Sequence, residues 1–307
     1  MIFVDRSLRK IYTLAFNIEE DGFDDLELTA TANHIIEDGV RQGHLAVAMR
    51  PDPRIYFVRS DGQLVCLTFL VKEKVVGFTR IVTDGVVESV AVIPRTGGRS
   101  DQVWITVRRT IGITERRYIE YLDDDAFNPD ADAAFGTGRP WASLQTDSAV
   151  TQSSASAGAT FTTVSGLSHL EGHTVDVVAD GSYVGQKTVS GGAITLDEAA
   201  TQVEVGLHYT STAVSMRPTV PNVILEGLER SWDSLWARLY KTRGGTINGE
   251  WIQYPADPLN APSVFTGDRR VTGQGWDTDG RITITQDQPY PMTVLAMFGT
   301  LTTGDHD

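Results

Sequence analysis

The chain has 307 residues, 41% of them hydrophobic, and a formal net charge of −14 at pH 7. These values allow a large buried core, but they exclude a protein that binds nucleic acid through a basic surface. The single cysteine, Cys66, excludes an intrachain disulfide and a cysteine-based zinc site. No apolar stretch reaches the length of a membrane span, and the N-terminus lacks the pattern of a signal peptide.

The first part of the chain is dominated by alternation of apolar and polar residues, which predicts β-strands. Residues 1–16 read as a hairpin whose turn lies near Arg6–Arg9. Residues 28–36 break the alternation, because Leu28, Ala32 and Ile35 recur at helical spacing. The sequence therefore predicts a short helix between the first hairpin and the next strands.

Strand patterns then follow in two groups, at residues 44–82 and 86–122. In the first group, Asp61-Gly62 between alternating runs predicts a two-residue hairpin turn. Corresponding strands of the two groups are about 43 residues apart, which is the period of a four-stranded propeller blade.

Residues 123–160 change in character and predict a connection. The acidic stretch Asp123–Asp132 lacks the glycine and the closing glutamate of a calcium loop, so a solvated connector is favoured over a cation site. A second β pattern follows at residues 173–211, with hairpin signals at Asp180-Gly181 and Gly191-Gly192.

The last section begins with an ambiguous stretch. Residues 226–242 fit helical spacing and also alternate as a strand. The remainder predicts β structure, with Pro289 and Pro291 confined to a strand start or an edge.

The motifs "ESVAVIP" (88–94), "DQVWITVRR" (101–109) and "RYIE" (117–120) give the chain a familiar pattern. In this order they resemble the propeller region of tail nozzle proteins of short-tailed bacteriophages, the tail tubular protein B type. Residues 167–196 resemble a small β module found inserted in these proteins. That module is named after the first catalytic-cysteine half-domain of ubiquitin-activating enzymes, and here it contains no cysteine.

The resemblance implies a mainly β fold, with a propeller-like antiparallel body and an inserted small β-barrel or sandwich module. The expected domains are a body at 1–143, the inserted module at 144–220, and a C-terminal β segment at 221–307 that completes the body. The resemblance also favours a strand at residues 235–241 and a connector at Asp123–Asp132. Related proteins are usually much longer, and fewer blades than a closed propeller needs can be counted in this chain. Either the sheet closes differently, or another chain completes it.

The function that the resemblance implies is a structural, non-enzymatic component of the virion tail, made in the host bacterial cytoplasm. The chain would form a homo-hexameric distal nozzle ring that contacts adaptor and fibre proteins. Genome DNA would pass through the ring without specific binding, since an acidic lumen repels it. No catalytic residue, metal site or cofactor is expected.

The expected contact surface combines an aromatic residue with a basic cluster. Trp104 should pack between blades or subunits, because alternation puts Val103, Ile105 and Val107 on the opposite, core face. The expected subunit or partner contacts are Trp104, Arg108, Arg109, Arg116 and Arg117, with Asp123, Asp124 and Asp125 facing them from a neighbour.

Two other classes of function stay open from the sequence. A glycan- or receptor-binding tail module would use exposed aromatic residues; the candidates are Trp232, Trp236, Trp251 and Trp276. A hydrolase of host-surface polysaccharide would need paired carboxylates, for which Glu115, Glu120 and Asp123–Asp125 are candidates.

Overall fold

The computed structural model describes residues 1–17, 21–30, 32–94, 100–122, 144–154, 156, 158–219, 227–252, 264–272 and 275–304. The fold is mainly β, built from several antiparallel sheets, as the sequence predicts. The chain divides into two compact units, residues 1–127 and 128–307. The predicted domain boundaries at residues 143 and 220 lie outside the described residues and stay predictions.

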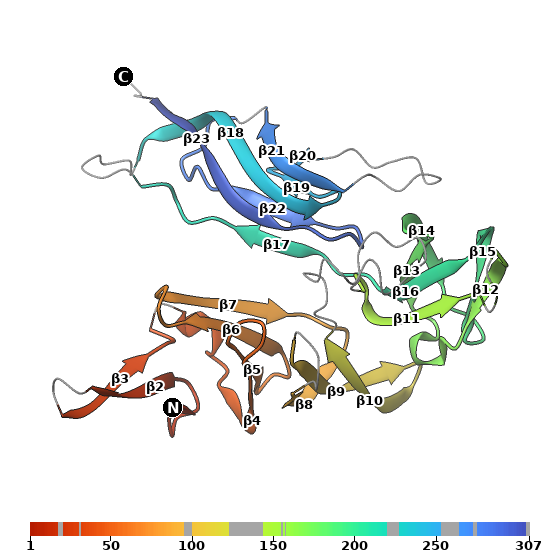
Figure 1. The fold of residues 1–307 in the computed structure, drawn as a ribbon, viewed down its shortest axis with the longest axis horizontal. Helices are drawn as coiled ribbons and strands as arrows, with labels where there is room; N and C mark the ends of the chain where they lie inside the picture. The colour runs from red at the N-terminus through yellow and green to blue at the C-terminus, as the bar shows by residue number, and fades with distance from the viewer. Residues whose placement is uncertain are drawn as a thin grey trace. The chain divides into compact units, whose positions relative to one another are not determined.

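Unit 1 contains antiparallel sheets that follow one another in chain order, from red to yellow in Figure 1. The first is β1 (Ile2–Val4), β2 (Ile11–Asn17) and β3 (Gly22–Glu27); the second is β4 (Val40–Ala48), β5 (Arg54–Arg59), β6 (Leu64–Leu70) and β7 (Val75–Ile81); the third is β8 (Val86–Ile93), β9 (Gln102–Ile111) and β10 (Thr114–Leu122). The strand groups predicted for residues 1–122 are thereby confirmed.

The central strands β5 and β6 of the middle sheet are buried on both faces. One face packs against the first sheet and the short turn after it, through a core that includes Ile55 and Phe57 of β5. The other face packs against the third sheet, through a core that includes Tyr56 and Val58. Burial of both faces explains why β5 and β6 read as nearly continuous apolar runs rather than alternating ones.

The Asp61-Gly62 turn connects β5 and β6, but its loop is longer than predicted. The amide of Arg59 donates to the carbonyl of Gln63 at 2.8 Å, which leaves a three-residue loop at 60–62. Gly62 has a φ of 89°. A Cβ there would lie 2.3 Å from Cγ1 of Val86, so only glycine fits against the third sheet.

The helix predicted for residues 28–36 is wrong. The described residues of this stretch contain a single 3-10 turn, Asn33–Ile35. The amide of Leu28 donates to the carbonyl of Ile11 at 2.8 Å, which continues the pairing of β2 with β3. Leu28 and Ile35 are therefore buried by the tertiary core and not by one face of a helix.

The first part of unit 2 is a small β module with its own core. One sheet has the order β11-β16-β13-β14, and β12 pairs with β15 beside it. Their bounds are β11 (Asp147–Ser153), β12 (Phe161–Ser165), β13 (Thr174–Ala179), β14 (Ser182–Thr188), β15 (Ala193–Ala200) and β16 (Gln202–Leu207). A 3-10 turn, Ser168–Leu170, buries Leu170 in the same core.

The second part of unit 2 is a pair of sheets around a separate core. Their orders are β17-β22-β19-β20 and β21-β18-β23. The bounds are β17 (Ser211–Val214), β18 (Glu229–Thr242), β19 (Thr246–Ile247), β20 (Glu250–Trp251), β21 (Phe265–Val271), β22 (Thr283–Gln286) and β23 (Val294–Gly304). Strands of both sheets contribute to this core.

The strand predicted for this region is confirmed, whereas the two prolines lie outside any strand. Residues 229–242 form the long strand β18, with Leu235, Ala237 and Leu239 facing the core. Pro289 and Pro291 are expected at a strand start or an edge, but they lie in the connection between β22 and β23, where no ladder hydrogen bond is required of them. The further prediction that this segment completes the body of unit 1 stays a prediction.

Candidate interaction surface

The third sheet of unit 1 has one core face and one outer face. Val103, Ile105 and Val107 of β9 face the core, as the alternation predicts. On the outer face Trp104 lies directly opposite Tyr121 of β10, with ring centroids 5.2 Å apart. We refer to the side of β8–β10 that carries Trp104 and Tyr121 as the outer face.

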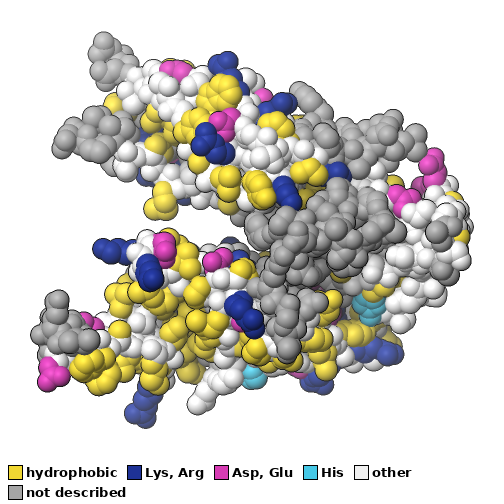
Figure 2. Space-filling model, viewed as in Figure 1, with side chains coloured by type: hydrophobic (Ala, Val, Ile, Leu, Met, Phe, Trp, Pro, Cys, Tyr) yellow, Lys and Arg dark blue, Asp and Glu magenta, His cyan; other side chains and the backbone are white. Residues whose placement is uncertain are grey.

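The outer face carries exposed apolar and aromatic side chains. Ile119, which lies opposite Thr106, is 75% exposed, and Tyr121 is 49% exposed. Trp104 itself is half-buried. Its indole Nε1 is shielded from solvent and has no hydrogen-bond partner among the described residues. Hydrophobic side chains also reach the surface elsewhere in unit 1 (Figure 2).

Beside these aromatic residues lies a group of ion pairs. Arg108 and Arg117 are cross-strand neighbours, and both contact Glu88, at 3.2 and 2.7 Å. Arg108 also pairs with Glu115. The hydrogen bond from Arg117 lowers the pKa of Glu88 below its ordinary value, against the opposing effect of burial. The positive charges of Arg108 and Arg117 on neighbouring strands are thus balanced by glutamates of the same sheet.

Arg109 and Arg116 lie on the face of the sheet opposite to Trp104. Burial removes Arg109 from the predicted contact surface, whereas the contact role of Arg116 stays a prediction. Arg109 is 2% exposed. Its Nε donates to the carbonyl of Asp84 at 2.6 Å, its Nη2 donates to Oγ1 of Thr83 at 2.7 Å, and its guanidinium pairs with Glu120. Arg109 is therefore a buried structural residue and offers no group to a partner, whereas Arg116 is exposed.

The acidic half of the predicted contact, Asp123, Asp124 and Asp125, lies outside the described residues. The glutamates of the hydrolase alternative are described, and they do not form a pair. Glu115 lies opposite Thr110 and Glu120 lies opposite Ile105, so the two carboxylates project to opposite faces of the sheet. Each is already engaged by an arginine.

Unit 2 contains a polar pocket of about 290 Å³ beside the start of β18. Its lining combines two tryptophans with charged and amide side chains: Arg230, Trp232, Asn248, Gly275, Trp276, Asp277, Gly280 and Arg281. The sequence offered four tryptophans as candidates for sugar binding, and the fold brings Trp232 and Trp276 together. We refer to this site as the tryptophan pocket.

A second polar cluster joins the module to the last sheets of unit 2. The carboxylate of Asp176 on β13 contacts His208 Nδ1 at 2.7 Å, and His208 Nε2 lies 3.3 Å from Asp287. The hydroxyl of Tyr183 and the amide of Gln186 also donate to Asp176, each at 3.0 Å. No sequence motif pointed to His208, because the three groups come from distant parts of the chain.

The described residues contain no group of three or more His, Cys, Asp or Glu side chains arranged to hold a metal ion. In the same part of the chain, no helix is long and apolar enough to cross a membrane. His169 contacts the carbonyl of Ser148 at 3.2 Å, which is a structural role.

The described residues define a mainly β protein of stacked antiparallel sheets with an aromatic sheet face in unit 1 and a polar pocket in unit 2. No protein-family model and no curated protein matches the chain. Among solved structures, an exo-beta-1,3-galactanase from Phanerochaete chrysosporium is similar at 13% identity and a TM-score of 0.23, over 96% of this chain and 67% of that one. A TM-score this low does not establish a shared fold.

Proposed function

We propose that this protein is a structural component of a short-tailed bacteriophage tail, and that it forms the nozzle ring around the DNA exit channel. The proposal rests on the sequence resemblance and on one structural observation: the sheets of unit 1 pack face to face in chain order. Neighbouring propeller blades pack in this way. The motifs that carry the resemblance lie on β8, β9 and β10.

The outer face of β8–β10 is the surface that we assign to contact between subunits. Aromatic and arginine side chains are enriched at protein interfaces, and this face carries Trp104, Tyr121, Arg108 and Arg117. Trp104 Nε1 is a buried donor that lacks a partner among the described residues. A neighbouring subunit that supplied an acceptor would remove the cost of that unpaired donor.

The charge distribution supports passage of DNA without adhesion. The chain has 40 acidic and 26 basic residues. Arg108, Arg109 and Arg117 are each paired with a glutamate of the same chain, so they are not free to neutralise phosphates. Since phosphate neutralisation supplies most non-specific DNA affinity, weak binding to duplex DNA is expected even at low salt.

Native mass spectrometry of the purified chain, alone and mixed with virion tail proteins, tests the proposal. We expect a ring of identical subunits, with six as the number that the resemblance implies. Ile119→Asp, on the outer face, should prevent assembly, whereas Ile113→Asp, at the fully exposed turn of the same hairpin, should not. A chain that stays monomeric in both settings, or that binds duplex DNA tightly, would overturn the proposal.

A further inference from the structure

The tryptophan pocket is bordered by a loop that hydrogen bonds attach to the start of β18. Residues Arg230 and Asp277 exchange backbone hydrogen bonds at 2.9 Å, which attaches the loop to the start of β18. The Asp277 carboxylate accepts the amide of Gly280 at 3.2 Å and closes the turn. Gly280 has a φ of 59°, and a Cβ there would lie 2.5 Å from Cδ of Arg230. The turn at Gly280 therefore packs closely against the aliphatic part of the Arg230 side chain.

The two indoles occupy different positions in this pocket. Trp232 is half-buried and packs against the core, and its Nε1 donates to the carbonyl of Gly280 at 3.0 Å. Trp276 is 54% exposed. Its ring edge lies over Gly304 at the end of β23, where a Cβ would come within 3.1 Å of it. Trp276 therefore presents an aromatic surface to solvent while its ring edge packs against Gly304.

The polar lining of the pocket has a positive balance. Arg281, whose side chain is 44% exposed, is the accessible cation of the lining, because Arg230 is 4% exposed and its Nη1 donates to the carbonyl of Pro218 at 3.4 Å. Asp277 contributes one carboxylate, which accepts the amide of Gly280. Arg281 Nε is 3.7 Å from Asp279, which Arg217 contacts at 2.6 Å. The two arginines of the lining outnumber its one aspartate, so the lining favours an anionic ligand over a cationic one.

We propose that the tryptophan pocket binds one ring of an acidic saccharide. An aromatic platform matches the apolar C–H face of a pyranose, while arginine, asparagine and aspartate side chains match its hydroxyls and carboxylate. The volume of about 290 Å³ lies just below the usual range for drug-sized ligands, which fits a single sugar ring. The guanidinium of Arg281 favours an acidic sugar over a neutral one.

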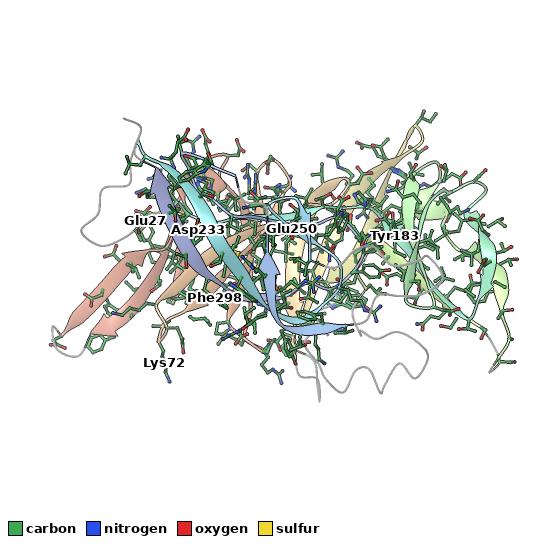
Figure 3. All side chains as sticks on the ribbon, turned by 90° about the horizontal axis from the view of Figure 1, so that it is seen from above. Glu27, Lys72, Tyr183, Asp233, Glu250 and Phe298 are labelled. Carbon is green, nitrogen blue, oxygen red and sulfur yellow. The ribbon has the colours of Figure 1, made fainter. Side chains whose placement is uncertain are left out.

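The test is titration of the full chain with sodium D-glucuronate, N-acetylneuraminate, D-glucose and D-galactose. Tryptophan fluorescence and saturation-transfer NMR would report binding. We expect saturable binding of at least one acidic sugar, weakened about tenfold by Trp276→Ala. Trp236→Ala is the matched control, since Trp236 lies on β18 outside the pocket and opposite Phe298, labelled in Figure 3. Arg281→Gln should reduce the preference for acidic over neutral sugars.

Three results would overturn the inference: no saturable binding of any of the four sugars, equal binding of acidic and neutral sugars, or binding that Trp276→Ala leaves unchanged. The site does not depend on the proposed nozzle role. Ligand titration tests whether the pocket binds an acidic sugar, whereas subunit assembly tests the nozzle role, so the two proposals can fail independently.

Discussion

Asp176 and His208 are 32 residues apart in the sequence, and in the folded chain the carboxylate of Asp176 contacts His208 Nδ1 at 2.7 Å. Asp287 faces the other ring nitrogen, Nε2, at 3.3 Å. A neutral imidazole has one N–H, so it donates to only one of the two carboxylates. The protonated form donates to both, and it therefore connects the β module to the loop that follows β22.

The pH dependence of His208 follows from this geometry. Burial lowers the pKa of His208, but the hydrogen bond and charge of Asp176, together with Asp287, outweigh it and raise that pKa above the ordinary value of 6.5. A raised pKa stabilises the fold below the unfolded value, and the stabilisation is lost as the pH rises through the folded value. Tyr183, Gln186 and Thr210 are further polar groups at this cluster.

We therefore expect the difference in thermal midpoint between the wild type and His208→Gln to be larger at pH 5.5 than at pH 8.5. Differential scanning fluorimetry at both pH values measures it. Comparison with the variant removes the contribution of the other titrating groups. An equal difference at the two pH values would show that His208 is not protonated in the folded chain.

The docking of the module onto the last sheets also depends on Tyr290. Its hydroxyl accepts the amide of Tyr183 at 2.7 Å, and its ring packs against Val178. Figure 3 labels Tyr183 within the module. Tyr290→Phe leaves that amide without its acceptor, so the free energy of unfolding should fall by about 1–3 kcal/mol. Tyr240→Phe, on an exposed face of β18, should have little effect in the same denaturant titration.

Arg109 and Arg116 provide a matched pair for testing the corrected role of the arginine cluster. They are cross-strand partners, but Arg109 is buried with Glu120 and Arg116 is exposed. Arg109→Ala leaves the Glu120 carboxylate without its cation and should destabilise unit 1 by about 3–5 kcal/mol. Arg116→Ala should change stability by less than about 0.5 kcal/mol. Similar losses from both variants in urea unfolding would contradict the assignment.

Asp101 joins the middle and third sheets of unit 1. Its carboxylate accepts the amides of Met49 at 2.8 Å and Arg50 at 3.2 Å. The hydrogen bond from Met49 lowers the pKa of Asp101 below 3.8, against the opposing effect of burial. Its contribution to stability is thus present above pH 3.8 and is lost as the pH falls through the folded value.

Asp101→Asn should then cost about 1.5–3 kcal/mol at pH 7, where the wild-type carboxylate is charged. Asp52→Asn, at a nearby exposed position, is the control. Urea unfolding at pH 7 measures both variants. A loss no larger than that of the control would show that the two backbone hydrogen bonds do not stabilise the junction between the sheets.

Much of the fold could be read from local patterns. Alternation in β9 separates Val107 from Arg108, and it predicts which side of the strand faces the core without knowledge of the neighbouring strands. Gly62 of the Asp61-Gly62 pair indicates a turn, because glycine adopts a positive φ with little steric strain. These features depend on residues close in sequence, so the sequence alone determined them.

Other features depend on pairing between distant segments, and no local pattern contains them. Arg109 and Arg116 look equivalent in sequence, yet the register of β9 and β10 and the carbonyl of Asp84 bury only the first. The helical spacing at Leu28 was misleading because a strand contact with Ile11 buries that side chain equally well.

The sequence by itself determined a mainly β chain, its strand positions and its acidic balance, since each follows from residue type and short-range periodicity. Only the tertiary structure decided that Trp232 and Trp276 share a pocket and that His208 lies between Asp176 and Asp287. The physical reason is that such sites require polar and aromatic groups from separate strands within a few ångströms. Long-range strand pairing fixes those distances, and residue spacing along the chain does not.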